Sequence, residues 1–160
     1  MALWVLGLSL ALAFYAFVGY PLVLLFVGLV RRQHPIARSG EDDWPLVSIS
    51  VAAYNEEAQI GQLIESLLAL DYPRDRLQIL ITSDGSTDAT DSIIREYEQK
   101  GVELFRPPER LGKTGAENAA SGLLRGEIIV NTDASTRIDP KALKKLVGAL
   151  QDPAVGCASG

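Results

Sequence analysis

The sequence predicts an α/β fold in which a membrane-spanning helix precedes a Rossmann-like parallel sheet with helices on both faces. Three observations predict this fold. Residues 3–30 carry no charge. After about Trp44, short apolar runs alternate with segments of helical periodicity, which is typical of a parallel sheet covered by helices. Two of these runs end in an acidic residue followed by small or hydroxylated residues, at 84–88 and at 133–135.

Residues 1–32 are expected to form a transmembrane anchor. A bilayer core about 30 Å thick needs about 20 apolar residues in a helix, and the uncharged run is longer than that. A cleaved signal peptide is the alternative, but no basic residue precedes the run and the run extends well past the usual length of such a peptide. Arg31, Arg32 and Arg38 follow the run. The excess of positive charge on this side predicts a single-pass membrane protein whose remaining residues are cytoplasmic.

Residues 33–45 are expected to be a juxtamembrane linker, because serine, glycine, proline and acids are frequent there. Residues 46–160 have the composition of a globular domain. The formal net charge of −5 argues against a partner that is a nucleic acid. The single Cys157 excludes an internal disulfide and fits a reducing compartment.

Strand and helix alternate along the predicted domain. The first helix is expected to begin at Asn55 as the N-cap, with Glu56 and Glu57 in its first turn. Another helix is expected to start at Asp139 and Pro140. The predicted strands are 47–51, 77–82, 102–105, 128–130 and a fifth at 155–158. The predicted helices include 113–124 and segments around residues 60–68, 93–97 and 143–150.

Two carboxylates, Asp84 and Asp133, follow two of the predicted strands. The carboxyl ends of parallel strands meet at one edge of the sheet, where open α/β folds bind their ligands. We therefore expect a site for a nucleotide, a metal or both. The turn after the first strand, residues 52–57, contains no glycine, which disfavours a dinucleotide-binding oxidoreductase. The chain also lacks the glycine-rich phosphate loop of nucleotide triphosphatases.

Four motifs together resemble the family-2 glycosyltransferases, which have the GT-A fold. They occur in the order and at the approximate spacing of that family, and they cover about residues 46–160. The motifs are Val47-Ser48-Ile49-Ser50-Val51-Ala52-Ala53-Tyr54-Asn55-Glu56-Glu57, then Asp84-Gly85-Ser86-Thr87-Asp88, then Arg110-Leu111-Gly112-Lys113 with Ala116, Asn118 and Ala120, and then Asn131-Thr132-Asp133-Ala134-Ser135. The apolar segment with Gly19-Tyr20-Pro21 resembles the membrane-bound, polysaccharide-synthase-like branch of the family.

The resemblance implies a role for each matching residue in binding the substrate. Ala53 and Tyr54 match the segment that lies against the nucleoside. Asp84 matches the acid that holds the base or the ribose. Arg110 and Lys113 match a basic segment near the nucleotide.

A divalent metal, Mg²⁺ or Mn²⁺, is also implied. Asp133 matches the first acid of the Asp-x-Asp motif, which in the family contacts the sugar nucleotide and its metal. Ser135 stands in place of the second acid. A hydroxyl or a water molecule can complete the ligand shell, because Mg²⁺ keeps several waters and takes few carboxylates.

The resemblance implies a glycosyltransferase of polysaccharide biosynthesis. It would transfer a sugar, with inversion, from a nucleotide-diphosphate sugar to a saccharide or lipid-linked acceptor at the cytoplasmic membrane face. The family places its catalytic base after the equivalent of Gly160, so the chain is expected to be the donor-binding half of the fold. A non-catalytic nucleotide-binding fragment or partner subunit is the alternative. We further expect that Asp84→Ala would leave the fold intact, because a carboxylate in a polar turn contributes little packing.

Overall fold

The computed structural model of this chain describes residues 1–30, 44–152 and 154–160. It has two compact units, the N-terminal helix and the α/β domain, which are described separately below. The three arginines used above to orient the anchor lie outside the described residues, as does nearly all of the predicted linker.

The N-terminal unit is one continuous apolar helix. Its parts are α1 (Ala2–Phe14), the π-helical segment η1 (Tyr15–Gly19) and α2 (Tyr20–Val30). The stretch Leu3–Leu29, 27 residues, is long and apolar enough to cross a membrane. The π-helical segment is followed by Tyr20 and then Pro21, and the Tyr20 amide donates to the Tyr15 carbonyl. Proline cannot donate a backbone hydrogen bond, and the π-helical turn shifts the hydrogen-bond register at this point.

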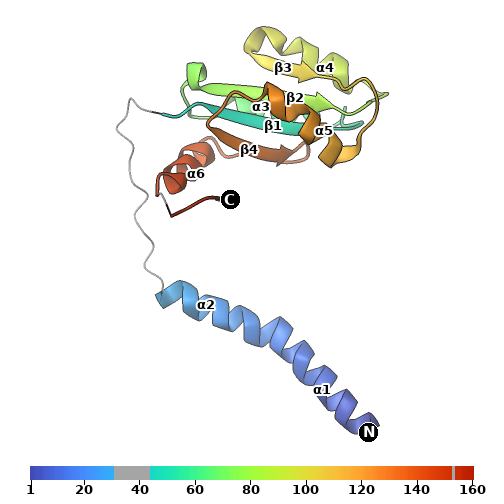
Figure 1. The fold of residues 1–160 in the computed structure, drawn as a ribbon, viewed down its shortest axis with the longest axis vertical. Coiled ribbons are helices and arrows are strands. Elements are labelled where there is room, and N and C mark those ends of the chain that lie inside the picture. The colour runs from blue at the N-terminus through green and yellow to red at the C-terminus, as the bar shows by residue number, and fades with distance from the viewer. Residues whose placement is uncertain (31–43, 153) are drawn as a thin grey trace. The chain divides into compact units, whose positions relative to one another are not determined.

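The domain is built on four parallel strands in the order β3-β2-β1-β4 (Figure 1). The strands are β1 (Val47–Ala53), β2 (Leu77–Ser83), β3 (Val102–Phe105) and β4 (Ile128–Asp133). The chain proceeds from β1 outward to β3 and then crosses to the other side of β1 to form β4. The strand order therefore reverses between β1 and β4, and α/β sheets bind ligands at such a point.

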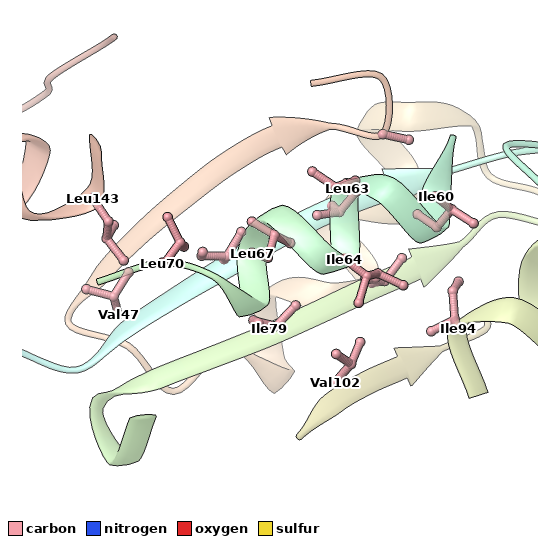
Figure 2. Packing of buried hydrophobic residues seen from close by; sticks show 14 of the residues in the cluster. Val47, Ile60, Leu63, Ile64, Leu67, Leu70, Ile79, Ile94, Val102 and Leu143 are labelled. Carbon is pink, nitrogen blue, oxygen red and sulfur yellow. The ribbon is translucent and has the colours of Figure 1, made fainter. Parts of the chain in front are cut away.

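One face of the sheet carries the apolar core. Alternate side chains of a strand point to opposite faces, and the odd-numbered residues of β1, together with Ile79 and Ile81 of β2, are apolar and buried. They pack with side chains from α3 (Ile60–Leu68), α4 (Thr90–Glu96) and α6 (Ala142–Leu150) (Figure 2). The helix α3 supplies four fully buried residues: Ile60, Leu63, Ile64 and Leu67.

The other face is more polar and lies against α5 (Gly112–Ala120) and the short turn η4 (Ser121–Leu123). Ser48, Ser50, Gln78 and Thr82 are all buried there. Helices thus cover both faces, which confirms the predicted α/β architecture. Two further short 3₁₀ turns, η2 (Arg74–Arg76) and η3 (Glu98–Lys100), precede β2 and β3.

A buried hydrogen-bond network closes the amino-terminal end of the polar face. The Ser48 hydroxyl donates to Gln78 Oε1 (2.5 Å) and accepts from the Gly126 amide (2.7 Å). The Arg125 amide donates to the same Gln78 oxygen at 2.9 Å. A Cβ atom on Gly126 would lie only 2.3 Å from the Ser48 amide nitrogen. Only glycine fits at this position, because the obstructing atoms belong to the backbones of β1 and β4.

Several sequence predictions of element boundaries are wrong. No strand occurs at 155–158; the Val155 amide instead donates to the Asp152 carbonyl within a turn. The helix predicted over 113–124 ends at Ala120 and continues as η4, and α6 begins at Ala142 rather than at Pro140. Cys157, the single cysteine, is exposed.

The prediction that Asn55 caps a helix is also wrong. Asn55 adopts a left-handed backbone conformation (φ 54°), and its side chain accepts a hydrogen bond from the Thr87 amide at 2.8 Å. The helix α3 begins five residues later, and its first turn contains neither Glu56 nor Glu57. The reason is tertiary: the loop after β1 bonds to the loop after β2.

Candidate functional site

A cavity of about 360 Å³ opens at the carboxyl ends of β1, β2 and β4. It therefore lies at the reversal of strand order described above. The structure brings all six sequence-predicted site residues into its lining: Ala53, Tyr54, Asp84, Arg110, Lys113 and Asp133. The remaining lining residues are Ala52, Glu56, Gly112, Ala134 and Ser135. Residues from three separate strand ends thus share one site.

Asp84 is buried beneath this cavity and organises the segment that precedes α5. The residue is only 3% exposed. One carboxylate oxygen accepts from the Leu111 amide and the other from the Gly112 amide, each at 2.7 Å. These amides belong to the start of α5, where backbone N–H groups lack partners inside the helix. Asp84 therefore acts as a remote cap for α5 and fixes the position of the basic segment.

The basic segment lies against the aromatic wall of the cavity. The Arg110 guanidinium carbon is 3.7 Å from the centre of the Tyr54 ring, a cation–π contact. Gly85, which follows Asp84, has a φ of +75°, and a Cβ there would lie 3.3 Å from the Arg110 Cβ. Glycine at this turn therefore permits both the backbone conformation and the close approach of Arg110.

Lys113 and Asp133 form an ion pair across the mouth of the cavity. The Lys113 Nζ lies 2.5 Å from Asp133 Oδ1, and the two side chains are 61% and 63% exposed. The hydrogen bond to Asp133, followed by the charge of Asp133, raises the pKa of Lys113. Asp133 is the last residue of β4 and lies opposite Ala52 of β1. The carboxylate is thus held at the sheet edge while remaining open to solvent.

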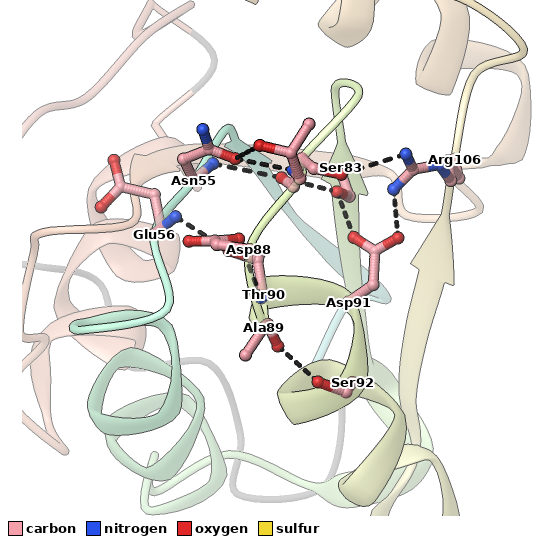
Figure 3. Close-up of polar contacts among 11 residues, drawn as sticks. Asn55, Glu56, Ser83, Asp88, Ala89, Thr90, Asp91, Ser92 and Arg106 are labelled. Atoms are coloured by element: carbon pink, nitrogen blue, oxygen red, sulfur yellow. Dashed lines mark hydrogen bonds and ion pairs between the residues drawn. The ribbon is translucent and has the colours of Figure 1, made fainter.

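The loops after β1 and β2 are joined by reciprocal hydrogen bonds (Figure 3). The Glu56 amide donates to the Thr90 hydroxyl (2.8 Å), and the Glu57 amide donates to the Asp88 carboxylate (3.1 Å). The Glu57 carboxylate in turn accepts from the Ala89 amide (2.9 Å). These bonds fix the Tyr54 side of the cavity relative to α4. The Glu57 and Asp88 carboxylates are therefore structural in this loop pair, whereas Glu56 contributes only its backbone amide.

Asp88 and Asp91 lie behind the cavity. Burial works to raise the pKa of Asp88, but hydrogen bonds from Thr90 and Glu57 outweigh it and lower the pKa below its ordinary value. Asp91 lies in the first turn of α4, where it accepts a hydrogen bond from the Ser83 hydroxyl and pairs with Arg106 (Figure 3). Arg106 also donates to the Ser86 carbonyl at 3.1 Å. This network supports the turn that carries Asp84.

The donors in the cavity suit a divalent metal only in part. Asp133 provides an exposed carboxylate, and Ser135 lines the same cavity with a hydroxyl. Both are oxygen donors of the kind that Mg²⁺ and Mn²⁺ prefer. Within residues 1–30, 44–152 and 154–160, no group of three or more His, Cys, Asp or Glu is placed to hold a metal ion. A metal here would therefore need ligands from a bound substrate and from water.

A second, larger cavity of about 860 Å³ runs along β4 and α6. It contains none of the six predicted site residues. Its lining is mainly apolar and includes Ile129, which is 50% exposed on the edge strand. This cavity provides a reference location against which ligand binding at the first can be compared.

Some lining residues were not predicted as site residues. Glu56 was assigned to helix capping, yet it reaches the cavity because the chain makes a left-handed turn at Asn55. Gly112 and Ala134 lie beside predicted residues on the same loops. The only sequence signal for Gly112 and Ala134 is that each is adjacent to a predicted site residue.

Comparison with known protein families gives a match over residues 48–160 to the model described as glycosyl transferase family 2. The match covers most of the chain. The chain belongs to glycosyl transferase family 2. The family predicted from the four motifs is therefore confirmed.

Relatives in this family extend beyond the domain. A probable glycosyltransferase, YdaM, of Bacillus subtilis is 32% identical over 136 residues, which is 81% of this chain and 32% of the relative. A beta-monoglucosyldiacylglycerol synthase of Nostoc is 33% identical over 159 residues, which is 97% of this chain and 32% of the relative. The chain thus spans about a third of the length of these curated relatives.

Among solved structures, a mannosyltransferase from Pyrobaculum calidifontis in complex with GDP-Man and Mn²⁺ matches with a TM-score of 0.76 and 31% identity. The match covers 94% of this chain and 45% of that one. The Staphylococcus aureus protein TarS, in complex with UDP-GlcNAc, matches with a TM-score of 0.62 and 27% identity, over 66% of this chain and 31% of its own. These neighbours confirm the predicted GT-A type of fold.

Proposed function

We propose that this chain is the donor-binding part of a glycosyltransferase that moves a sugar, with inversion, from a nucleotide-diphosphate sugar to a saccharide or lipid-linked acceptor. One observation carries the proposal. A single cavity at the reversal of strand order combines an aromatic wall, two cations and an exposed carboxylate. A nucleotide sugar presents a planar base and a diphosphate, whose chemical counterparts in the cavity are the aromatic wall and the two cations.

The nucleoside is assigned to the wall formed by Ala53 and Tyr54. Tyr54 is 38% exposed as a residue, so it remains accessible for contact with a base or ribose. Asp84 lines the same cavity and holds the segment that carries Arg110 and Lys113. The diphosphate is assigned to the two cations, because neutralising its charge favours both binding and departure of the leaving group.

Asp133, together with the Ser135 hydroxyl, is the group that would hold a divalent metal beside the diphosphate. When bound there, Mg²⁺ or Mn²⁺ would neutralise the negative charge that develops on the departing nucleoside diphosphate. Asp133 would orient the phosphates through this contact, and Lys113 would supply a second positive charge at the same position. Mn²⁺ in the complex of the mannosyltransferase neighbour supports this assignment.

We assign the acceptor to saccharides or lipids; the name of one relative states a lipid product, and the name of another states only the sugar transferred. The Nostoc relative is a synthase of a glycosylated diacylglycerol, and another, from Rhizobium sp. (strain N33), is an N-acetylglucosaminyltransferase. A direct transfer with inversion needs a carboxylate to deprotonate the acceptor hydroxyl, and none of the six assigned residues has that role.

The experiment that tests the proposed function is nuclear magnetic resonance mapping of the full chain in detergent micelles. GDP and UDP, each with Mg²⁺, are added to ¹⁵N-labelled protein. We expect the largest amide shifts at Ala52, Tyr54, Gly112 and Ala134, which line the first cavity. Shifts confined to the larger cavity along β4 and α6, or no shifts with either nucleotide, would reject the proposal.

We also propose that the Leu3–Leu29 helix crosses the membrane and that the domain is cytoplasmic. The helix is uncharged and long enough to span, and the arginines that follow it in the sequence favour this orientation. Carbonate washing is expected to leave the chain in the membrane fraction, and protease added to intact cells is expected to spare the domain. Release by carbonate contradicts the span, and digestion from outside contradicts the orientation.

A further inference from the structure

The Lys113–Asp133 ion pair joins the two groups that the proposed function assigns to the diphosphate and to the metal. The Lys113 Nζ and Asp133 Oδ1 lie 2.5 Å apart. Both residues line the first cavity, and they come from different elements, the first turn of α5 and the end of β4. The carboxylate that would hold a cation therefore already has a cation beside it.

Formation of α5 does not explain the position of Lys113. A positive charge in the first turn of a helix is unfavourable, because the helix dipole is positive at that end. The first turn of α5 contains no acidic residue, and Glu117, one turn further along, acts on Lys113 less strongly than Asp133 does. The nearby amides of Leu111 and Gly112 are satisfied by Asp84, which holds the lysine at the cavity rather than pairing with it. The partner of Lys113 is Asp133, on another element.

We propose that Lys113 is an internal counter-ion that occupies Asp133 until a nucleotide diphosphate binds, so that metal and nucleotide enter the site together. This inference rests on the proposed function and adds an order of binding to it. Without nucleotide, a divalent cation has to compete with the Lys113 ammonium for a single carboxylate. When a diphosphate is bound, Lys113 has a second anion to pair with, and Asp133 is released to the metal.

The proposal makes binding of metal and nucleotide cooperative. A nucleotide that frees Asp133 raises the affinity for metal. Because coupling between two ligands is reciprocal, bound metal raises the affinity for nucleotide by the same factor. Removing the ammonium removes the competitor, so the affinity for metal alone should rise and the coupling factor should fall. A lysine that merely supports the fold would change neither quantity in these directions.

The test uses the full chain in detergent, with Mn²⁺ binding followed by electron paramagnetic resonance of the free ion. Four proteins are compared: the parent, Lys113→Met, the double variant Lys113→Met/Asp133→Asn, and Lys141→Met as a control that loses the same charge from an exposed position outside the cavity. Each is titrated alone and with saturating GDP or UDP.

Without nucleotide, Lys113→Met is expected to bind Mn²⁺ about threefold more tightly than the parent, an increase of the size expected for an exposed ion pair. Lys141→Met should match the parent, and the double variant should lose the gain. With nucleotide, the coupling factor should be smaller in Lys113→Met than in the parent. Unchanged affinity and coupling in Lys113→Met, beside intact nucleotide-dependent Mn²⁺ binding in the parent, would overturn the counter-ion role alone. Absence of Mn²⁺ binding in every protein, with and without nucleotide, would overturn the proposed function and this inference together.

Discussion

Asp84→Ala is expected to lower the free energy of unfolding by about 3 kcal/mol and to weaken nucleoside diphosphate binding at least tenfold. The carboxylate is buried and accepts from two backbone amides at 2.7 Å, both at the start of α5. Alanine would remove two hydrogen bonds to a charged acceptor, and such bonds contribute more to stability than the packing of this side chain. The loop carrying Arg110 and Lys113 would then lose its anchor. Urea unfolding and calorimetric titration with GDP or UDP measure the two effects.

The expectation from sequence that Asp84→Ala would leave the fold intact considered packing alone, whereas Asp84 is buried and accepts two backbone hydrogen bonds. Asp75→Ala serves as the control, because Asp75 is an exposed acid at the opposite end of β2 with only a long 3.8 Å contact to Arg76. If Asp84→Ala were as stable as Asp75→Ala, the remote capping role would be refuted. If it bound nucleotide with parental affinity, the loop would not depend on Asp84.

Gly126→Ala is expected to destabilise the domain by about 3 kcal/mol or more. The added Cβ would lie 2.3 Å from the Ser48 amide nitrogen and 2.8 Å from the Val47 carbonyl carbon. Both atoms belong to the backbone of the central strand β1, so no rotation of a side chain relieves the overlap. The hydrogen bonds that the Arg125 and Gly126 amides donate to the Ser48 and Gln78 side chains would break as a result.

Gly122→Ala is the matched control for that variant. It lies four residues earlier in the same connection, and a Cβ there meets no atom within 4 Å. Its stability is expected to stay within about 0.5 kcal/mol of the parent. Urea unfolding followed by circular dichroism compares the two. Equal stability of Gly126→Ala and Gly122→Ala would show that β1 can move away from this connection.

The parallel sheet and the location of the site could be predicted from sequence because both depend on local patterns. Apolar runs ending in Asp84 and Asp133 identify two strand ends, and parallel strand ends share one edge. The resemblance of the surrounding motifs to one family then identified Tyr54, Arg110 and Lys113, which the structure brings into the same cavity.

The features missed from sequence depend on contacts between distant segments. Asparagine is a common helix N-cap, which is why Asn55 was expected to begin a helix. Its side chain instead accepts a hydrogen bond from Thr87, 32 residues away, and its backbone is left-handed. Asp84 resembles an exposed turn residue until α5 is placed against it. The close approach of Gly126 to Ser48 joins residues 78 apart. Tertiary contacts of this kind override local preference and leave no periodic signal.

The central claim is that nucleoside diphosphate binding in this cavity is linked to a divalent metal through Asp133. Calorimetric titration of the full chain with GDP and UDP, in Mn²⁺ and in chelator, tests it directly on the parent, Asp133→Asn and the exposed control Asp75→Asn. Chelator is expected to weaken binding to the parent and to Asp75→Asn about tenfold or more, because the metal neutralises the phosphates. Asp133→Asn should bind equally in both conditions, at the level of the parent in chelator. If chelator left the parent's affinity unchanged for both nucleotides, Asp133 would not be a metal-linked residue, and the claim would be contradicted.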